Sequence, residues 1–197
     1  MVSMTCLIII GLLLTVSWTA SSTTDDDITI RNELKDIRLR LNDLEIFKTK
    51  ISSRFALAAG ALFEISPEFE GRRYYLSKRT GGAAIPVSEA TCELFGGYLV
   101  EIDDLKEYRF VQNFIRNHSS DFFGVYTGGN DEDREGTWVY RHSKEPAVLL
   151  DWTPGQPTND VDGDCLILLN RNDWRMDDFR CYYDNSDTRF MCEVPME

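Results

Sequence analysis

Apolar residues recur at alternating intervals of three and four positions between residues 30 and 58. In a helix this spacing aligns them on one face, and a stripe sustained over about four heptads is typical of a coiled coil. The stripe consists of Ile30, Leu34, Ile37, Leu41, Leu44, Ile51, Phe55 and Ala58, with the polar Lys48 at one a position. The pattern predicts an α-helical coiled-coil neck over residues 30–62.

Charged residues beside this stripe favour parallel assembly. Glu33 and Arg38 occupy successive g and e positions, and Arg40 and Glu45 do so one heptad later. Both pairs attract in a parallel, in-register coiled coil. A single amphipathic helix packed on its own domain would show the same stripe, but the shared register favours a homo-oligomer through residues 30–58. The stripe leaves dimer and trimer open.

Beyond the neck, the pattern changes to short runs separated by glycine, aspartate, asparagine and proline. A strand is predicted around 74–76, a short helix from Ser88, and a second helix from Asp104, where Asp and Glu three residues apart form a capping box. After His118 the runs predict strands joined by long loops. This order of elements predicts an α+β domain over residues 70–197.

An apolar run precedes the neck and is followed by small residues. Residues 1–21 are typical of a secretory signal peptide, and residues 22–29 form an acidic spacer. The run is shorter than the ~20 residues that a membrane-spanning helix needs, so no membrane insertion is expected. The mature chain would be secreted and extracellular. Its even set of cysteines fits an oxidising compartment but allows three pairings: Cys92, Cys165, Cys181 and Cys192.

The charge balance narrows the classes of partner. A net charge of -12 repels phosphate backbones and anionic lipids, so nucleic acid is not an expected partner and divalent cations are better ones. No enzyme motif accompanies the two histidines, His118 and His142. Asp177 and Asp178 are a poor glycosidase pair, because adjacent side chains on a strand point to opposite faces. A binding protein is therefore expected rather than an enzyme.

Several motifs occur in an order that resembles the C-type lectin domain. They are Phe122-Phe123-Gly124-Val125, Glu135-Gly136-Thr137-Trp138, Trp152-Thr153-Pro154-Gly155-Gln156-Pro157, Asp164-Cys165, Met176-Asp177-Asp178 with Cys181, and Phe190-Met191-Cys192-Glu193. The resemblance covers essentially the whole globular part, and with the neck it is similar to the secreted invertebrate type. It implies a C-type lectin-like fold with two helices, two small antiparallel sheets and a long loop region.

The resemblance also implies disulfides and a calcium-dependent sugar site. It pairs Cys92 with Cys192 and Cys165 with Cys181. Calcium prefers six to eight oxygen ligands, which two acidic segments of this chain can supply. The residues at the positions of the sugar-binding calcium ligands are Gln156, Thr158, Asp177 and Asp178, with Asp162 as a substitute ligand. The residues at the positions of the auxiliary calcium ligands are Asp131, Glu135, Asn159 and Asp164.

Two departures from the family pattern bear on this site. Thr158 replaces the usual Asn or Asp, and Gly163 stands where a further Glu ligand is usual. Gln156 resembles the variant associated with galactose-type sugars. The expected function is therefore multivalent, calcium-dependent recognition of microbial or self glycans, of the innate-immune or self-glycan type. The alternative is a lectin-fold scaffold that binds protein, mineral or matrix without calcium-dependent sugar binding.

One modification motif is present. Asn117-His118-Ser119 is an N-glycosylation sequon placed just past the second predicted helix. In a secreted protein, this triplet predicts a glycan on Asn117.

Overall fold

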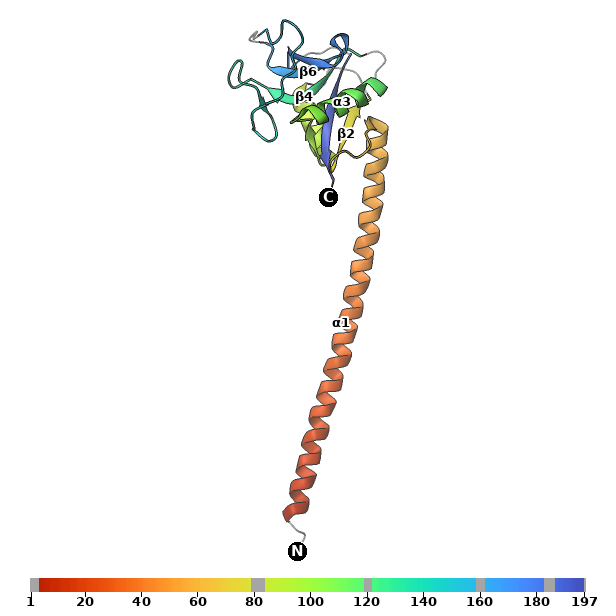
Figure 1. Ribbon diagram of the computed structural model, residues 1–197. Coiled ribbons are helices and arrows are strands. Elements are labelled where there is room, and N and C mark those ends of the chain that lie inside the picture. Colours follow the sequence, from red (N-terminus) through yellow and green to blue (C-terminus); the bar gives the residue numbers. More distant parts are fainter. Residues whose placement is uncertain (1–3, 79–83, 119–121, 159–161, 183–186, 197) are drawn as a thin grey trace. The chain divides into compact units, whose positions relative to one another are not determined.

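The chain forms two compact units, Met1–Arg54 and Phe55–Glu197. The computed structural model in Figure 1 describes residues 4–78, 84–118, 122–158, 162–182 and 187–196, with the backbone alone for residues 4–23. The helices are α1 (Met4–Leu62), α2 (Ile85–Leu94), α3 (Leu105–His118) and the 3-10 helix Asn170–Asn172. The strands are β1 (Phe63–Ile65), β2 (Arg72–Ser77), β3 (Tyr98–Leu99), β4 (Gly124–Asn130), β5 (Val139–Tyr140), β6 (Cys165–Leu169), β7 (Arg175–Phe179) and β8 (Thr188–Pro195).

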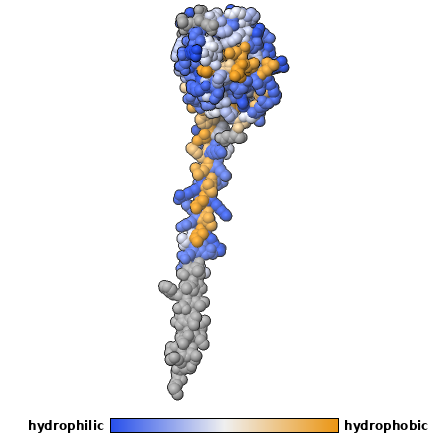
Figure 2. Space-filling model, turned by 60° about the vertical axis from the view of Figure 1, so that its left-hand side comes forward, coloured by the Kyte–Doolittle hydropathy of each residue, from blue (hydrophilic) through white to orange (hydrophobic). Residues whose placement is uncertain are grey.

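The first unit is part of helix α1, which contains the predicted neck and also runs through the predicted acidic spacer. Ion pairs one helical turn apart stabilise it, from Arg31 to Asp27 at 2.8 Å and from Arg40 to Asp36 at 2.9 Å. Apolar side chains line up along the helix and are exposed (Figure 2). Among the described residues, no helix combines the length and apolar character needed to cross a membrane.

The second unit is built on one mixed sheet. Its strand order is β1-β2-β8-β4-β6-β7, with β3 added on β8 and β5 on β4. The α+β class is confirmed, but the two small antiparallel sheets expected are joined into one. The reason is the length of β8: Met191–Pro195 pairs antiparallel with β2, whereas Thr188–Phe190 pairs parallel with β4.

This unit begins earlier than residue 70, where the domain was predicted to start. β1 pairs antiparallel with β2, and its first residue, Phe63, is almost fully buried. The Phe63 ring packs edge-on against the Phe95 ring, with 5.3 Å between the ring centroids. Phe55, in the last turns of α1, also packs edge-on against Phe95, at a centroid distance of 6.3 Å. The end of the helix is therefore part of the second unit.

Helix α2 begins three residues before the predicted start at Ser88. Pro86 lies in its first turn, where the missing N–H costs no hydrogen bond, and its fixed φ suits a helix start. Ser88 is buried inside the helix. As expected, glycine ends the helix: Gly96 adopts φ +80, a left-handed conformation that glycine tolerates best.

Helix α3 starts with the predicted capping box in a slightly shifted form. The Asp104 carboxylate accepts hydrogen bonds from the backbone N–H groups of Lys106 and Glu107, each at 2.8 Å. In return, Glu107 accepts from the N–H of Asp103 at 2.9 Å rather than from Asp104 itself. The buried face of the helix contains Val111, Phe114 and Ile115.

Of the two apolar clusters in this unit, one contains all four cysteines of the two disulfides. Cys92–Cys192 joins α2 to β8, and Cys165–Cys181 joins the start of β6 to the residues just after β7. These are the pairings that the family resemblance implies. On the loop-entropy model, the bridge with a separation of 100 residues contributes roughly 4–5 kcal/mol and the bridge with 16 about 3 kcal/mol.

Candidate functional site

The loop that holds Pro157 meets strand β7 through four predicted ligand residues. The Gln156–Pro157 peptide bond is cis. The Gln156 side-chain amide donates a hydrogen bond to Asp177 Oδ1 at 3.0 Å. The backbone N–H and the hydroxyl of Thr158 both donate to Asp178 Oδ2, each at 2.7 Å. Oxygen-bearing side chains from two distant segments therefore converge here.

The backbone before this loop explains why the two segments meet. Trp152 forms a parallel bridge with Met176, and the N–H of Thr153 donates to the Met176 carbonyl at 2.7 Å. The Trp152 ring also packs edge-on against the buried Trp138 at 5.0 Å. These contacts fix the loop entry beside the residue that precedes Asp177. The Trp-x-x-Gly-Gln-Pro motif thus places its polar residues next to the two aspartates.

Several side-chain oxygens at the site are buried and lack a protein partner. Gln156 Oε1, Asp177 Oδ2 and Asp131 Oδ1 accept no hydrogen bond from the described residues. Asp177 is only 2% exposed, and burial raises its pKa. Leaving a buried acceptor unsatisfied costs about 1–3 kcal/mol, so such groups usually bind water, a ligand or an ion. The donor set of hard oxygens fits calcium.

The predicted auxiliary ligands form a second acidic group nearby. The N–H of Asp131 donates to the Asp164 carbonyl at 3.2 Å, and Asp131 Oδ2 accepts from the Gly136 N–H at 2.8 Å. The pKa values of Asp131, Glu135 and Asp164 are all raised, first by desolvation and then by neighbouring carboxylates. Asp178 is among the repelling groups for Asp131 and Glu135. A bound cation would relieve this repulsion.

The remaining site predictions fare differently. Asp162 makes an exposed ion pair with Arg180 at 3.6 Å, and its charge is among the causes that raise the pKa of Asp164, after desolvation. Asn159 lies outside the described residues, as does Ser119 of the sequon. The sequon was expected just past a helix, but Asn117 and His118 belong to the last turn of α3. Within that turn, His118 Nδ1 lies 2.9 Å from the Phe114 carbonyl.

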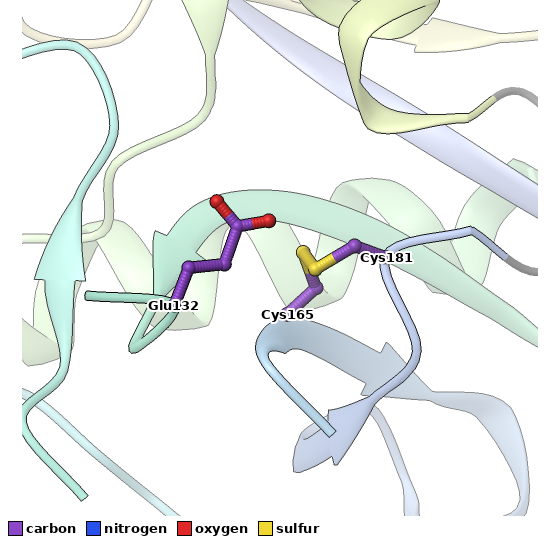
Figure 3. A group of neighbouring side chains, drawn as sticks. All are labelled: Glu132, Cys165 and Cys181. Carbon is purple, nitrogen blue, oxygen red and sulfur yellow. A yellow bond between two sulfur atoms is a disulfide. The ribbon is translucent and has the colours of Figure 1, made fainter. Parts of the chain in front are cut away.

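The structure adds one pair of residues that the sequence did not indicate. Glu132 lies beside the Cys165–Cys181 disulfide (Figure 3). These sulfur atoms cannot ligate a metal as thiolates, because they are bonded to each other. Instead, the Arg141 guanidinium lies 2.7 Å from Glu132 and 3.3 Å from Cys165 Sγ. No sequence signal marks this contact, since eight residues of turn and short strand separate its two ends.

Comparison with known proteins identifies the fold and the family. A family model described as Lectin C-type domain matches residues 84–194. A perlucin-like protein of Mytilus galloprovincialis is 29% identical over 93 residues, which cover 47% of this chain and 60% of the relative. The galactose-specific lectin nattectin of Thalassophryne nattereri is 31% identical over 74 residues, which cover 38% and 46%. The chain thus spans about half the length of these relatives.

A solved calcium-independent type II antifreeze protein has a similar structure. Its TM-score is 0.54 at 21% identity, and the match covers 66% of this chain and 91% of that chain. At this identity, the likeness shows a common fold alone. The family model, however, matches more than half of the 197 residues. The chain therefore belongs to the C-type lectin domain family.

Proposed function

We propose that this chain binds sugars through calcium held by Gln156, Thr158, Asp177 and Asp178. The observation that carries the proposal is the convergence of two buried oxygens, Gln156 Oε1 on the loop and Asp177 Oδ2 on β7, that have no hydrogen-bond partner among the described residues. Family membership supports carbohydrate binding as the general activity and a binding role rather than catalysis. The auxiliary ligands Asp131, Glu135 and Asp164 would order the neighbouring loops.

The chemistry divides between the ion and the side chains. Calcium would supply coordination positions that two neighbouring sugar hydroxyls take from water. Asp177 and Asp178 would accept hydrogen bonds from those hydroxyls, and the Gln156 amide would donate one. The Thr158 hydroxyl already donates to Asp178 Oδ2 and so orients that carboxylate. No bond in the sugar is made or broken.

The preferred sugar in this proposal is of the galactose type. Gln156 is the residue that supports it, and one relative is described as galactose-specific. Thr158 contributes a neutral hydroxyl at the position of a usual amide or carboxylate, so the ion would rely more on the two aspartates. The second carboxylate, Asp177, compensates for that lost ligand charge.

The setting in this proposal is extracellular, and the active form is an oligomer. Two disulfides persist in oxidising compartments, which fits export guided by residues 1–21. The exposed apolar stripe of α1 would be covered by the same stripe of a second or third copy. Several weak sites on one oligomer would raise avidity for a glycan surface by about 10²–10⁴.

Replacing a stripe residue tests the oligomer. We expect Leu41→Asp to convert a dimer or trimer of the mature chain into a monomer, because burying one leucine contributes roughly 1.5–3 kcal/mol and a buried carboxylate costs more. Leu39→Asp is the matched control, since Leu39 is equally exposed (58% against 55%) but lies off the stripe. Sedimentation equilibrium measures the mass. A monomeric wild type, or equal effects of both changes, contradicts the coiled coil.

Calcium removal tests the sugar site. We expect the mature protein to be retained on immobilised galactose with calcium and to elute with a chelator, with weaker retention on mannose. Calcium should also raise the unfolding temperature, because an ion that binds only the folded state stabilises it by about 2.7 kcal/mol at 100 times its Kd. The alternative function predicts passage through glycan columns and no thermal shift.

That alternative is a lectin-fold scaffold that binds protein, mineral or matrix. Thr158 and Gly163 favour it, since Thr158 replaces the usual amide or carboxylate ligand by a neutral hydroxyl and Gly163 removes the usual Glu ligand. A solved relative in fold is described as calcium-independent, so the fold does not require calcium. The buried oxygens of Gln156 and Asp177 that lack a partner among the described residues favour the calcium-dependent function instead. The change in unfolding temperature on adding calcium decides between the two functions.

A further inference from the structure

Arg141 follows β5 and lies against the Cys165–Cys181 disulfide. Its Nη2 atom is 3.3 Å from Cys165 Sγ and 3.7 Å from Cys181 Sγ. Its backbone N–H donates to the Gly128 carbonyl at 2.8 Å, which fixes the start of the side chain on β4. The side chain is only 15% exposed. The guanidinium is therefore held in place by both its backbone and the bridge beneath it.

The same Nη2 atom also binds the loop that follows β4. Glu132 Oε1 accepts from it at 2.7 Å, which explains why the Glu132 carboxylate lies beside the disulfide in Figure 3. A charge-assisted hydrogen bond at this distance, partly shielded from water, is stronger than an exposed ion pair. Arg141 thus links Glu132 to both sulfur atoms through one nitrogen.

The three contacts reach three segments that carry proposed calcium ligands, while Gln156 and Thr158 lie on a further loop that Arg141 does not contact. Glu132 is next to Asp131 and three residues before Glu135. Cys165 directly follows Asp164, and Cys181 lies three residues after Asp178. The spacing of these segments sets the spacing of their oxygens. A single side chain that contacts all three can hold that spacing when no ion is present.

We propose that Arg141 is a positioning residue that holds the Asp131–Glu135 loop against the Cys165–Cys181 disulfide and so preorganises the calcium ligands. The inference rests on the proposed calcium site but concerns residues that are not ligands. Preorganisation strengthens metal binding because the loops are ordered before the ion arrives.

The positive charge of Arg141 allows an electrostatic role to be distinguished from a positioning role by the direction of the change in calcium affinity. A guanidinium near the site repels a divalent cation. If Arg141 acted through charge alone, removing it would tighten calcium binding. If it positions the loop, removing it weakens calcium binding. The two roles therefore predict opposite results for Arg141→Gln.

The experiment is a calcium titration of the full mature chain, followed by tryptophan fluorescence. We expect Arg141→Gln and the charge-retaining Arg141→Lys to raise the calcium Kd about tenfold, in the range typical of outer-shell residues. Arg180→Gln is the matched control, because Arg180 is also a cation near the site but is 63% exposed and paired with Asp162. It should leave the Kd unchanged or lower it. An Arg141→Gln Kd equal to or below that of wild type overturns the inference.

Glu132→Gln tests the other half of the contact without disturbing a buried residue. Asp133→Asn removes the same charge from the same loop and is its control. We expect Glu132→Gln to raise the calcium Kd several-fold more than Asp133→Asn does. Equal effects would show that loop charge, rather than the link to Arg141, sets the affinity.

A second measurement does not depend on calcium. In the chelated protein, amide hydrogen exchange at Asp131 and Gly136 should be about tenfold faster in Arg141→Gln and Glu132→Gln than in wild type, with both disulfides intact by mass spectrometry. Unchanged exchange overturns the positioning role. If the wild type binds no calcium but exchange is still faster in the two variants, the proposed function is refuted, and Arg141 remains the residue that orders the loop.

Discussion

Asp178→Ala should abolish calcium-dependent retention on galactose while both disulfides still form. Asp178 is almost fully buried, and it is the residue to which the Thr158 N–H and hydroxyl are both anchored. The substitution removes a proposed ligand charge and the acceptor that shapes the loop. Direct ligand loss exceeds the 10- to 100-fold effect of outer-shell changes, so we expect the calcium Kd to rise by at least about 100-fold.

Asp178→Asn separates the two roles of this carboxylate. The amide keeps one oxygen to accept from Thr158, so the loop should hold its shape while the ligand charge is lost. We expect the variant to fold with unchanged far-UV circular dichroism and to bind calcium almost as poorly as Asp178→Ala. The control variant Asp133→Asn loses an equal charge from a neighbouring loop and should still be retained on the galactose column in the presence of calcium. Calcium-dependent retention of Asp178→Ala at wild-type strength would show that the ligand assignment is wrong.

The sequence predicts the elements of this fold well wherever a local pattern determines them. The heptad stripe predicts helix over residues 30–62, and Asp104 with Glu107 predicts the start of α3 within a residue. These signals are local, because a helix face or cap depends on residues within one or two turns. The start of α2 was placed too late because Ser88 resembles an N-cap, whereas Pro86 lies in the first turn.

Long-range pairing was predicted less completely. The Phe-x-Cys-Glu motif marks β8 as a terminal strand, but nothing local shows that Thr188–Phe190 pairs parallel with β4. The same limit applies to β1, whose three residues lie outside the predicted domain. Strand partners depend on how distant segments pack, so the merging of two sheets into one becomes visible only in three dimensions.

The candidate site shows the same division between motif and context. Motif positions indicated Gln156, Thr158, Asp177 and Asp178, and the structure brings these four residues together. Asp162 was chosen for its nearness to Gly163 in sequence, and it pairs with Arg180 instead. The contact of Arg141 with Glu132 and the disulfide has no motif, because a single guanidinium gathers three separate segments.

The last residue of the final motif, Glu193, belongs to a buried charge network that the sequence also did not reveal. Arg72 lies 3.0 Å from Glu193 and 3.1 Å from Glu107, so one guanidinium serves two buried carboxyl groups. The Tyr98 hydroxyl donates to Glu193 at 2.8 Å, and the Glu101 N–H donates to it at 3.2 Å. Glu193 is only 1% exposed.

Burial raises the pKa of Glu193 from 4.5 to about 7, against the lowering effects of the Tyr98 hydrogen bond and of Arg72. Burial also raises the pKa of Glu107, which repels Glu193. The folded state therefore holds a proton that the unfolded chain releases at lower pH. The free energy of unfolding decreases with rising pH wherever the folded state binds more protons than the unfolded state. Glu193 therefore favours the folded state most below pH 4.5.

We therefore expect the free energy of unfolding to fall as pH rises from 4.5 to about 7 and to level off above that window. The contribution of Glu193 is at most about 3 kcal/mol, from 1.36 kcal/mol per pKa unit. Glu193→Gln cannot ionise and keeps an acceptor for Tyr98, so it should remove most of this slope. Glu107 and the buried aspartates of the calcium site, whose pKa values are also raised, leave a further slope of the same sign.

Urea unfolding at pH 5, 6, 7 and 8, in chelator to exclude bound calcium, measures the effect. Glu145→Gln is the control, because Glu145 is exposed and its substitution removes the same ionisable group from the surface. It should keep the wild-type slope, and Glu193→Gln should exceed wild-type stability at pH 8 more than at pH 5. Equal slopes in all three proteins would mean that Glu193 stays ionised in the fold, with Arg72 offsetting the cost of its burial.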